Sequence, residues 1–177
     1  NVQVETLPIN EHTAQMLESG DADLAYGGFV PGMDTGFYQQ ALIKQDFICL
    51  ASMDHPRVKG ALTLDDYQRE AHVAVSYGGI HGVNALIQSA LHAQQVERRV
   101  LLTLAGFLGI GKVIASTDLI TTLPHNIAET LAAQYELQLL ECPVRIPSYM
   151  IRQYWHARYH RDPGNQWLRR LCAQYAE

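Results

Sequence analysis

The chain has 177 residues, of which 47% are hydrophobic and 18% are charged, a composition that excludes an intrinsically disordered protein. Its formal net charge is −5, so the chain lacks the basic surplus that a nucleic-acid-binding surface needs. Its three cysteines show no CxxC spacing, which excludes a disulfide framework and a zinc site and indicates a reducing compartment.

The opening residues show no pattern that predicts a targeting segment. No apolar run approaches the length of a membrane span, and the opening NVQVETL has neither a positive region nor a signal-type core. These features predict a cytoplasmic protein with no membrane partner. The chain also opens without Met and inside a strand-like alternation, so we expect that further sequence lies upstream.

The first fifty residues predict strands around one helix. Val2 to Leu7 alternate apolar and polar side chains as a strand does, and Asn10 can cap a helix over 11–19 that Gly20 ends. Three further apolar segments are predicted strands: 22–28, 37–43 and 46–51. Strand, helix and strand in so few residues predict a parallel βαβ unit.

The rest of the chain repeats strands and helices. Thr63 to Asp66 predict a capping box that opens a short helix. Strands are predicted at 72–76, 100–104, 137–140 and 149–155. Helices are predicted at 83–94, with Ala85, Leu86, Ala90 and Leu91 on its apolar face, and at 124–134. Asp162 and Pro163 are a cap and a first-turn proline for a last helix, which carries Trp167, Leu168, Leu171 and Cys172.

This order predicts an α/β fold with two similar halves. The chain would cross between them near Ala51 and again near Tyr149, so that the last helix returns to the first half.

The stretch Gly106–Pro124 admits two interpretations. It reproduces the G-x-x-x-x-G-K of a phosphate-binding P-loop with Gly106, Gly111 and Lys112. Val113, however, stands where a P-loop needs a hydroxyl for magnesium, and Asp118 precedes an apolar strand instead of ending one. The other interpretation is a short helix that its glycines pack against a sheet, with its amino end facing a ligand cleft. The sequence favours this second interpretation.

Catalytic and metal-binding motifs are weak. His156 and His160 have the spacing of metal ligands on a helix, yet the element is broken just beyond them, which favours two structural histidines. The carboxylates of Asp65 and Asp66 lie at a helix start, where capping explains them, and no nucleophile elbow occurs. The sequence therefore predicts no enzyme, no metal site and no cofactor.

Three loops follow predicted strands at 28–31, 76–82 and 105–109, where open α/β sheets bind ligands. Backbone N–H groups at helix starts favour an anion, and aromatic side chains favour a flat apolar body, so we expect a small aromatic acid. Core packing is the alternative role for each aromatic residue. The candidate ligand-binding residues are Phe29, Val30, Ser76, His81, Gly82, Gly106, Phe107 and Tyr154.

The chain resembles the effector-binding (substrate-binding) domain of LysR-type transcriptional regulators. Five stretches in colinear order carry the resemblance: LESGDADLAYGGFVPGM, FICLASMDHP, TLDDY, STDLITTLP and YWHARYHRDPGNQWLRRL. The last stretch is most similar to the branch that responds to aromatic compounds, the nodulation and the naphthalene or nitrotoluene degradation regulators.

The resemblance implies two Rossmann-like subdomains of the periplasmic-binding-protein type 2, joined by two crossovers, with a small-molecule effector in the cleft between them. Residues 1–50 with 150–177 would form subdomain I, and residues 51–149 subdomain II. A winged helix-turn-helix that binds DNA, and the first strand and helix of the effector domain, would lie upstream of this chain. The resemblance also implies homodimers or homotetramers.

Two candidate residues match family positions, and a third departs from the pattern. By this resemblance His81 faces the inducer, and Phe107 is the aromatic residue in the loop before the helix of subdomain II. Gly106 departs from the pattern, because close relatives carry a histidine there. That difference removes a hydrogen-bond donor to an acid or hydroxyl group, so a salicylate-like specificity does not follow.

Two other hypotheses remain open from the sequence. A free solute-binding protein of the same architecture predicts a secretion signal upstream and few free cysteines. A P-loop-like nucleotide enzyme predicts magnesium-dependent ATP binding that Lys112→Ala abolishes.

Overall fold

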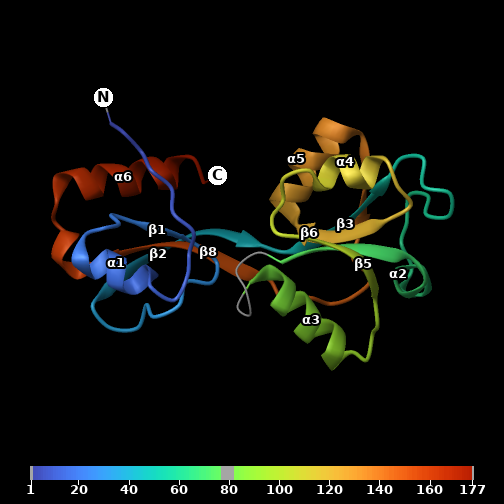
Figure 1. Ribbon diagram of the computed structural model, residues 1–177, viewed down its shortest axis with the longest axis horizontal. Helices are drawn as coiled ribbons and strands as arrows, with labels where there is room; N and C mark the ends of the chain where they lie inside the picture. The colour runs from blue at the N-terminus through green and yellow to red at the C-terminus, as the bar shows by residue number, and fades with distance from the viewer. Residues whose placement is uncertain (1, 77–81, 177) are drawn as a thin grey trace. The chain divides into compact units, whose positions relative to one another are not determined.

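The computed structural model (Figure 1) describes residues 2–76 and 82–176. The chain divides into two compact units. Unit 1 consists of Asn1–Lys44 and Met150–Glu177, and unit 2 consists of Gln45–Tyr149.

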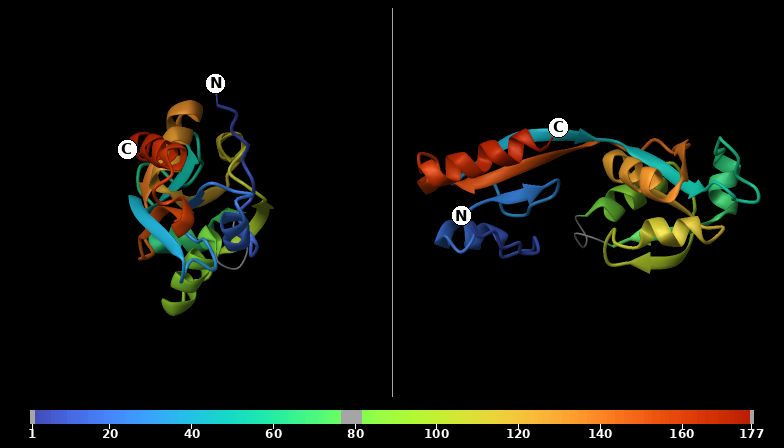
Figure 2. Two further views of the ribbon diagram at one scale, coloured as in Figure 1. Left: turned by 90° about the vertical axis from the view of Figure 1, so that its left-hand side faces the viewer. Right: turned by 90° about the horizontal axis from the view of Figure 1, so that it is seen from above.

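Unit 1 is built on a three-stranded sheet with the order β1-β8-β2. The strands are β1 (Ala25–Gly27), β2 (Phe37–Gln45) and β8 (Tyr149–His156). The helices are α1 (Thr13–Ser19), the 3-10 helix η2 (Ala157–Tyr159) and α6 (Pro163–Gln174). Helix α6 runs alongside the strands (Figures 1 and 2), and the Arg169 guanidinium lies 4.0 Å from the centre of the Trp155 ring on β8.

Two predictions for this unit are wrong, the strand at Val2–Leu7 and the parallel βαβ unit. Residues 2–7 have no regular secondary structure, and the side chains of Val2 and Val4 are 66% and 70% exposed. A strand needs a neighbour for its backbone N–H and C=O groups, and no described strand pairs with this segment. Strand β1 instead pairs antiparallel with β8, with Ala25 opposite Tyr154.

The predicted end of α1 is confirmed and its start is not. Gly20 ends the helix in the left-handed conformation with φ 94°. The helix begins at Thr13, because the Asn10 side chain accepts from the N–H of His12 in the turn before the helix and caps no helical residue.

Unit 2 is built on a five-stranded sheet with the order β5-β4-β6-β3-β7. Its strands are β3 (Phe47–Ser52), β4 (Ala71–Val75), β5 (Arg99–Leu104), β6 (Ile120–Pro124) and β7 (Leu137–Glu141). Strands β5, β4 and β6 are parallel, whereas β3 runs antiparallel to β6 and β7. Its helices are α2 (Leu64–Arg69), α3 (Val83–Ala93), α4 (Ile110–Ala115) and α5 (His125–Tyr135).

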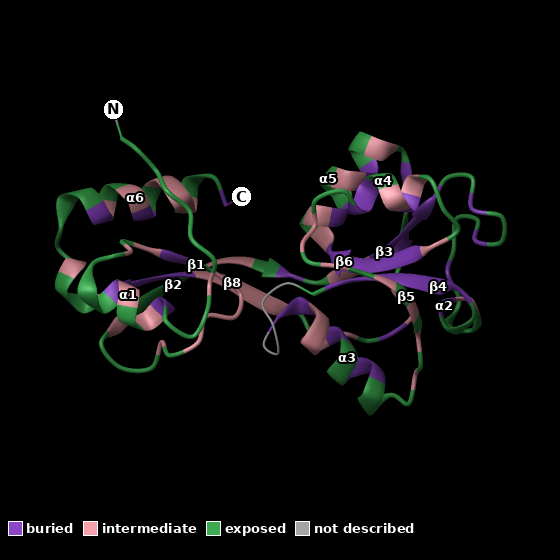
Figure 3. Ribbon diagram, viewed as in Figure 1, coloured by how far each residue is buried: buried purple, intermediate pink, exposed green. Residues whose placement is uncertain are grey.

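Helices cover both faces of this sheet, so the sheet has a core on each side. Figure 1 shows α4 and α5 on one face and α3 on the other. Cys49 packs toward α2 and α3, whereas its neighbour Leu50 packs toward α4 and α5. Every residue of β4 and β6 is buried (Figure 3), as expected for central strands that lie between two helix layers.

The first crossing between the units lies between Lys44 and Gln45, earlier than the expected position near Ala51. The crossing comes this early because β3 pairs with β6 and β7, which places the whole of β3 in unit 2. The second crossing lies between Tyr149 and Met150.

The helix predicted at 83–94 is present as α3, but its buried face is shifted. Ala85 and Leu86 are half-buried, and the buried residues are Val83, Ile87, Ala90 and Leu91. Their spacing is i, i+4, i+7, i+8, the pattern of one helix face. The sequence did not single out this face, because the residues at positions 85 and 86 are apolar as well.

Candidate functional site

The candidate residues of unit 1 lie just after β1 and on its neighbouring strand β8. Tyr154 on β8 is only 7% exposed and belongs to a buried cluster with Leu17 and Ala25. Val30 packs against that cluster, and Phe29 is half-buried in the segment just after β1. The Tyr154 ring therefore has a core-packing role in unit 1.

The candidate residues of unit 2 gather at one edge of the sheet. The N–H of Ser76 donates to the carbonyl of Leu104 at 2.8 Å, which ties the carboxyl end of β4 to that of β5. Gly106 and Phe107 come just after β5, separated from its last residue by Ala105, so they lie at the same edge as Ser76. His81 lies outside the described residues.

Gly82 caps the start of α3 with extended backbone, φ −83° and ψ −178°. Its carbonyl accepts from the N–H groups of Ala85 and Leu86, so the first turn of α3 is closed while its first backbone N–H groups have no partner within the helix. The positive end of the helix dipole is thus next to Gly82.

Space is available at Gly106. A Cβ atom built there meets no atom within 4 Å, and the backbone is not in the left-handed region. Neither packing nor conformation therefore requires glycine at this position. Phe107, by contrast, is half-buried and packs against the core between the sheet and helices α4 and α5.

The stretch after Phe107 supports packing and not a phosphate cradle. Gly111 is buried in α4, and a Cβ atom there would overlap the Tyr135 ring of α5. Lys112 is exposed, and Asp118 lies in the exposed turn before β6, 3.6 Å from the Arg57 guanidinium. The glycine at 111 thus brings two helices together, which is a sufficient reason for its place in the sequence.

His156 and His160 have separate structural roles. His156 ends β8, and its Nδ1 accepts from the N–H of Arg158 at 3.3 Å. The His160 ring stacks on Tyr38 at 4.1 Å between ring centres, and its Nδ1 accepts from the Trp155 indole N–H. The part of the chain that the structure describes contains no group of three or more His, Cys, Asp or Glu residues that could hold a metal ion.

Buried polar groups in unit 2 hold α2 against the sheet. The Tyr67 hydroxyl lies 3.1 Å from the Thr122 hydroxyl, and burial raises the pKa of Tyr67 to about 12. His72 Nε2 donates to the Tyr67 carbonyl at 2.7 Å, and burial lowers the pKa of His72 to about 4. Both side chains are therefore neutral at pH 7, and their hydrogen bonds position α2.

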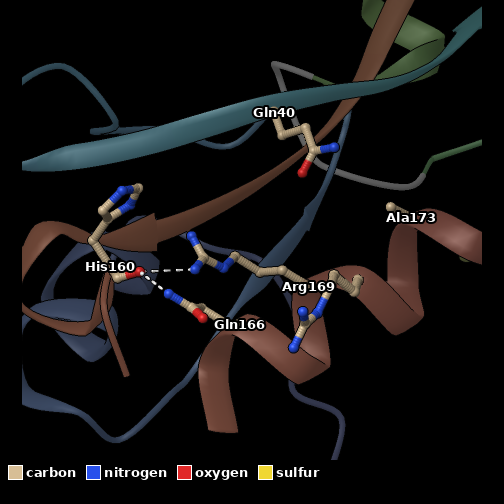
Figure 4. A pocket seen from close by; sticks show the side chains of 6 residues that line it. Gln40, His160, Gln166, Arg169 and Ala173 are labelled. Carbon is tan, nitrogen blue, oxygen red and sulfur yellow. Dashed lines mark hydrogen bonds between the residues drawn. The ribbon is translucent and has the colours of Figure 1, made fainter. Parts of the chain in front are cut away.

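Sequence reasoning missed a cavity of about 320 Å³ in unit 1 (Figure 4). Its lining residues are Gln40, His160, Gln166, Arg169, Arg170 and Ala173. A signal for it was present, because α6 carries adjacent arginines at 169 and 170 and no acidic residue.

The comparisons with known proteins identify the family. The model of the LysR substrate binding domain matches residues 1–177. The chain belongs to this family.

None of the helices within 2–76 and 82–176 combines the length and apolar character needed to cross a membrane.

The relatives confirm the branch expected from the last stretch. This chain is 36% identical over 177 residues to the HTH-type transcriptional activator NagR of Ralstonia sp. The match covers 98% of this chain and 57% of NagR. It is 28% identical over 178 residues to nodulation protein D 2 of Rhizobium leguminosarum bv. phaseoli, covering 99% of this chain and 54% of that protein. The chain therefore spans little more than half the length of these curated relatives.

Solved structures confirm the fold of two subdomains of the periplasmic-binding-protein type. A transcriptional regulator from Vibrio parahaemolyticus matches 96% of this chain and 78% of its own, with a TM-score of 0.82 and 26% identity. The effector binding domain of QuiR in complex with shikimate matches 95% of this chain and 78% of its own, with a TM-score of 0.72 and 15% identity.

Proposed function

We propose that this chain is the ligand-sensing regulatory domain of a LysR-type transcription factor that binds a small aromatic or acidic effector. The observation that carries the proposal is the family match over residues 1–177, together with relatives named as transcriptional activators. The domain acts by binding, not by catalysis, in the cytoplasm. DNA is contacted by an N-terminal domain outside this chain, which agrees with the net charge of −5, and the protein assembles as a homodimer or homotetramer.

In this proposal units 1 and 2 are the two regulatory subdomains, and the effector binds in the cleft between them. Unit 2 contributes Ser76, His81, Gly82, Gly106 and Phe107, and unit 1 contributes Phe29, Val30 and Tyr154. The N–H groups at the start of α3, next to Gly82, receive the carboxylate, because a helix amino end attracts an anion. The QuiR domain in complex with shikimate, itself a carboxylate, supports this effector class.

The effector regulates by shifting an equilibrium. A ligand changes the balance of two arrangements of the subdomains only through different affinities for them. A molecule that contacts residues of both units favours the arrangement in which both sets of contacts form. The dimer would transmit that arrangement to the DNA-binding domains.

Calorimetry with a panel of aromatic carboxylates and their neutral analogues tests the proposal. We expect saturable binding of at least one carboxylate, with its neutral analogue at least tenfold weaker. Ser76→Ala should weaken binding roughly fivefold, about the value of one hydrogen bond, whereas Ser89→Ala on the exposed side of α3 should have no effect. If no aromatic or acidic molecule binds, the proposal fails.

The open space at Gly106 allows a gain-of-function test. Gly106→His places a hydrogen-bond donor at this edge of the sheet, and the structure accommodates its Cβ without a clash. We expect this variant to bind 2-hydroxybenzoate several-fold more tightly relative to benzoate than the parent does. An unchanged ratio would place the 2-hydroxyl group away from residue 106.

A further inference from the structure

Two of the three cysteines lie together in unit 2, where β3 pairs with β7. In this antiparallel ladder Cys49 of β3 is opposite Leu140 of β7, and Cys142 comes two residues after Leu140. Alternate residues of a strand share a face, so Cys142 is on the same side of the sheet as Leu140 and Cys49. The packing agrees, because Cys49 and Leu140 belong to one buried cluster and Cys142 packs against it.

The two thiols differ in their access to solvent. Cys49 is 0% exposed, and its Sγ lies 3.4 Å from the Thr122 hydroxyl. Cys142 is half-buried and lines a cavity of about 440 Å³. All the residues that line this cavity belong to unit 2, so the cavity does not depend on the arrangement of the two units. A small molecule that enters it meets Cys142, whereas Cys49 is closed off from solvent.

The surroundings favour a thiolate at Cys142 and a protonated thiol at Cys49. Hydrogen bonding from the Cys49 thiol lowers the pKa of Cys142, although burial opposes it. The N–H of Val144 and the positive charge of Arg98 lower that pKa further. Hydrogen bonding to Cys142 and burial raise the pKa of Cys49. Cys142 is therefore the better nucleophile of the pair, because the thiolate is the reactive form of cysteine.

A disulfide between these two residues needs only a small change in the backbone. Diagonal neighbours on antiparallel strands have Cα atoms about 7–8 Å apart, whereas a disulfide spans up to about 6.8 Å. Cys142 lies just beyond the last residue of β7, outside the register of the ladder, so it can approach β3 without disturbing the sheet. It also begins the segment 142–149, which leads to the second crossing between the units.

We propose that Cys142 and Cys49 form a reversible redox site, in which hydrogen peroxide that enters the cavity oxidises the pair to a disulfide. In the first step the Cys142 thiolate attacks one peroxide oxygen, the O–O bond breaks, and a sulfenic acid and hydroxide form. In the second step the Cys49 sulfur attacks the sulfenic sulfur, and an S–S bond replaces the S–O bond. The hydroxyl group leaves as water with the Cys49 proton. The two sulfur atoms together lose two electrons, which the peroxide accepts.

This redox site goes beyond effector binding and does not rest on it, because neither cysteine belongs to the effector site proposed above. In a reducing compartment both residues are thiols at rest, and disulfides that form there are usually transient and redox-sensing. The disulfide ties the start of the segment 142–149 to β3. Oxidation therefore adds a covalent constraint to the stretch of chain that leads back to unit 1.

Peptide mapping after oxidation tests the proposal. Trypsin separates the three cysteines, because Cys49 falls in the peptide 45–57, Cys142 in 113–145 and Cys172 in 171–177. Hydrogen peroxide is added to the reduced protein, and the remaining thiols are alkylated before digestion. We expect a cross-linked product of 45–57 with 113–145 that has lost two hydrogen atoms, and that dithiothreitol separates again.

The order of reactivity is measured with iodoacetamide on the reduced protein. Burial raises the pKa of Cys172, which is half-buried on α6 in unit 1 and serves as the internal reference. Cys142 should react about tenfold faster than Cys172, because a larger fraction of it is thiolate, and Cys49 should react slowest.

Three variants assign the two roles. Cys142→Ser should leave Cys49 reduced at the same peroxide concentration, because the buried thiol is not reached. Cys49→Ala should still be oxidised at Cys142, but to a sulfenic acid that dimedone labels and not to a disulfide. The matched control Cys172→Ser should form the cross-link at the rate of the parent.

The proposal is overturned if the cross-link between 45–57 and 113–145 does not form, or if the peptide 171–177 is cross-linked to the same extent. It is equally overturned if Cys142 reacts no faster than Cys172, or if Cys49 is oxidised at the parent's rate in Cys142→Ser. The cross-link and the iodoacetamide rates are measured on the parent protein, so they decide the outcome even where a substitution alters the fold.

Discussion

Unit 2 buries both faces of its five-stranded sheet, whereas the three-stranded sheet of unit 1 has a small core. Two clusters of nine or more buried residues flank the sheet of unit 2, and the buried cluster of unit 1 contains Leu17, Ala25 and Tyr154. Figure 3 shows the same contrast, with buried strands in unit 2 and an α6 in unit 1 whose residues are mostly exposed or half-buried. Hydrophobic burial is the main favourable term in folding, so the part of unit 1 that this chain contains has the smaller margin of stability.

A matched pair of leucines tests this difference most strongly. Leu17 in unit 1 and Leu50 in unit 2 are both 0% exposed, and replacing either with Ala should cost about 3 kcal/mol. In unit 2 the remaining core retains the fold. In unit 1 the small cluster cannot absorb the loss, so Leu17→Ala should abolish amide hydrogen-exchange protection across α1 and β1 while unit 2 stays protected.

Hydrogen exchange read by mass spectrometry distinguishes the two units. Leu108→Ala is the control, because that side chain is 97% exposed and should change neither unit. Retained protection of α1 and β1 in Leu17→Ala would contradict the smaller margin of unit 1.

Acid should destabilise unit 2 through His72. Burial lowers the pKa of His72 from 6.5 to about 4, so between these pH values the unfolded state binds a proton that the folded state does not. The free energy of unfolding therefore falls as pH falls through this window, by at most about 3 kcal/mol. His72→Gln should flatten that part of the pH profile, whereas His92→Gln, at an exposed position of α3, should not.

Urea unfolding at a series of pH values measures this effect. The difference between the parent and His72→Gln isolates one residue, because the carboxylates titrate alike in both proteins. Parallel pH profiles for the two proteins would show that His72 is not a buried neutral group.

Elements set by local chemistry were predicted well from the sequence. The capping box of α2 is present, with the Thr63 hydroxyl accepting from the N–H of Asp66, and the Asp162 side chain caps α6 as expected. Gly20 ends α1 in the left-handed conformation. In each case the signal and its consequence lie within a few residues of one another.

Features set by distant pairing were not predictable in the same way. The alternation of Val2–Leu7 is typical of a strand, yet a strand exists only beside a partner. The position of the first crossing depends on the pairing of β3 with β6 and β7. The stacking of Arg169 on Trp155 joins a helix to a strand, so the cavity beside them had only the weak signal of two adjacent arginines. Among the candidate site residues, Ser76, Gly106 and Phe107 share one edge of the sheet. This was predictable from the sequence, because each of them follows a predicted strand.

A pair of glycines tests how tightly unit 2 is packed. Gly111→Ala should destabilise unit 2 by about 2 kcal/mol, because the new methyl group overlaps the Tyr135 ring. Gly106→Ala meets no atom within 4 Å and should change stability by less than about 0.5 kcal/mol. Thermal unfolding measures both, and Tyr135→Leu should partly rescue Gly111→Ala. If the two glycine variants unfold alike, close packing between α4 and α5 is not what restricts residue 111.

The smallest effects compare the helix caps of the two units. Thr63→Ala removes the acceptor for the Asp66 N–H at 3.1 Å, and Asp162→Ala removes the acceptor for the Asn165 N–H at 2.7 Å. Each change should cost about 1 kcal/mol. The consequences should differ, because α2 stays attached to its core through the fully buried Tyr67, whereas α6 is only half-buried along its apolar side.

Amide exchange should therefore rise throughout α6 in Asp162→Ala but only at the first turn of α2 in Thr63→Ala. Loosening α6 also moves Arg169 from the Trp155 ring, so the emission of Trp155 in the Trp167→Phe background should change in Asp162→Ala alone. Equal and local exchange in both variants would mean that α6 is held as firmly as α2 despite its smaller buried surface. In that case the stack of Arg169 on Trp155, together with the hydrogen bond to the His160 carbonyl, would be the contact that holds it.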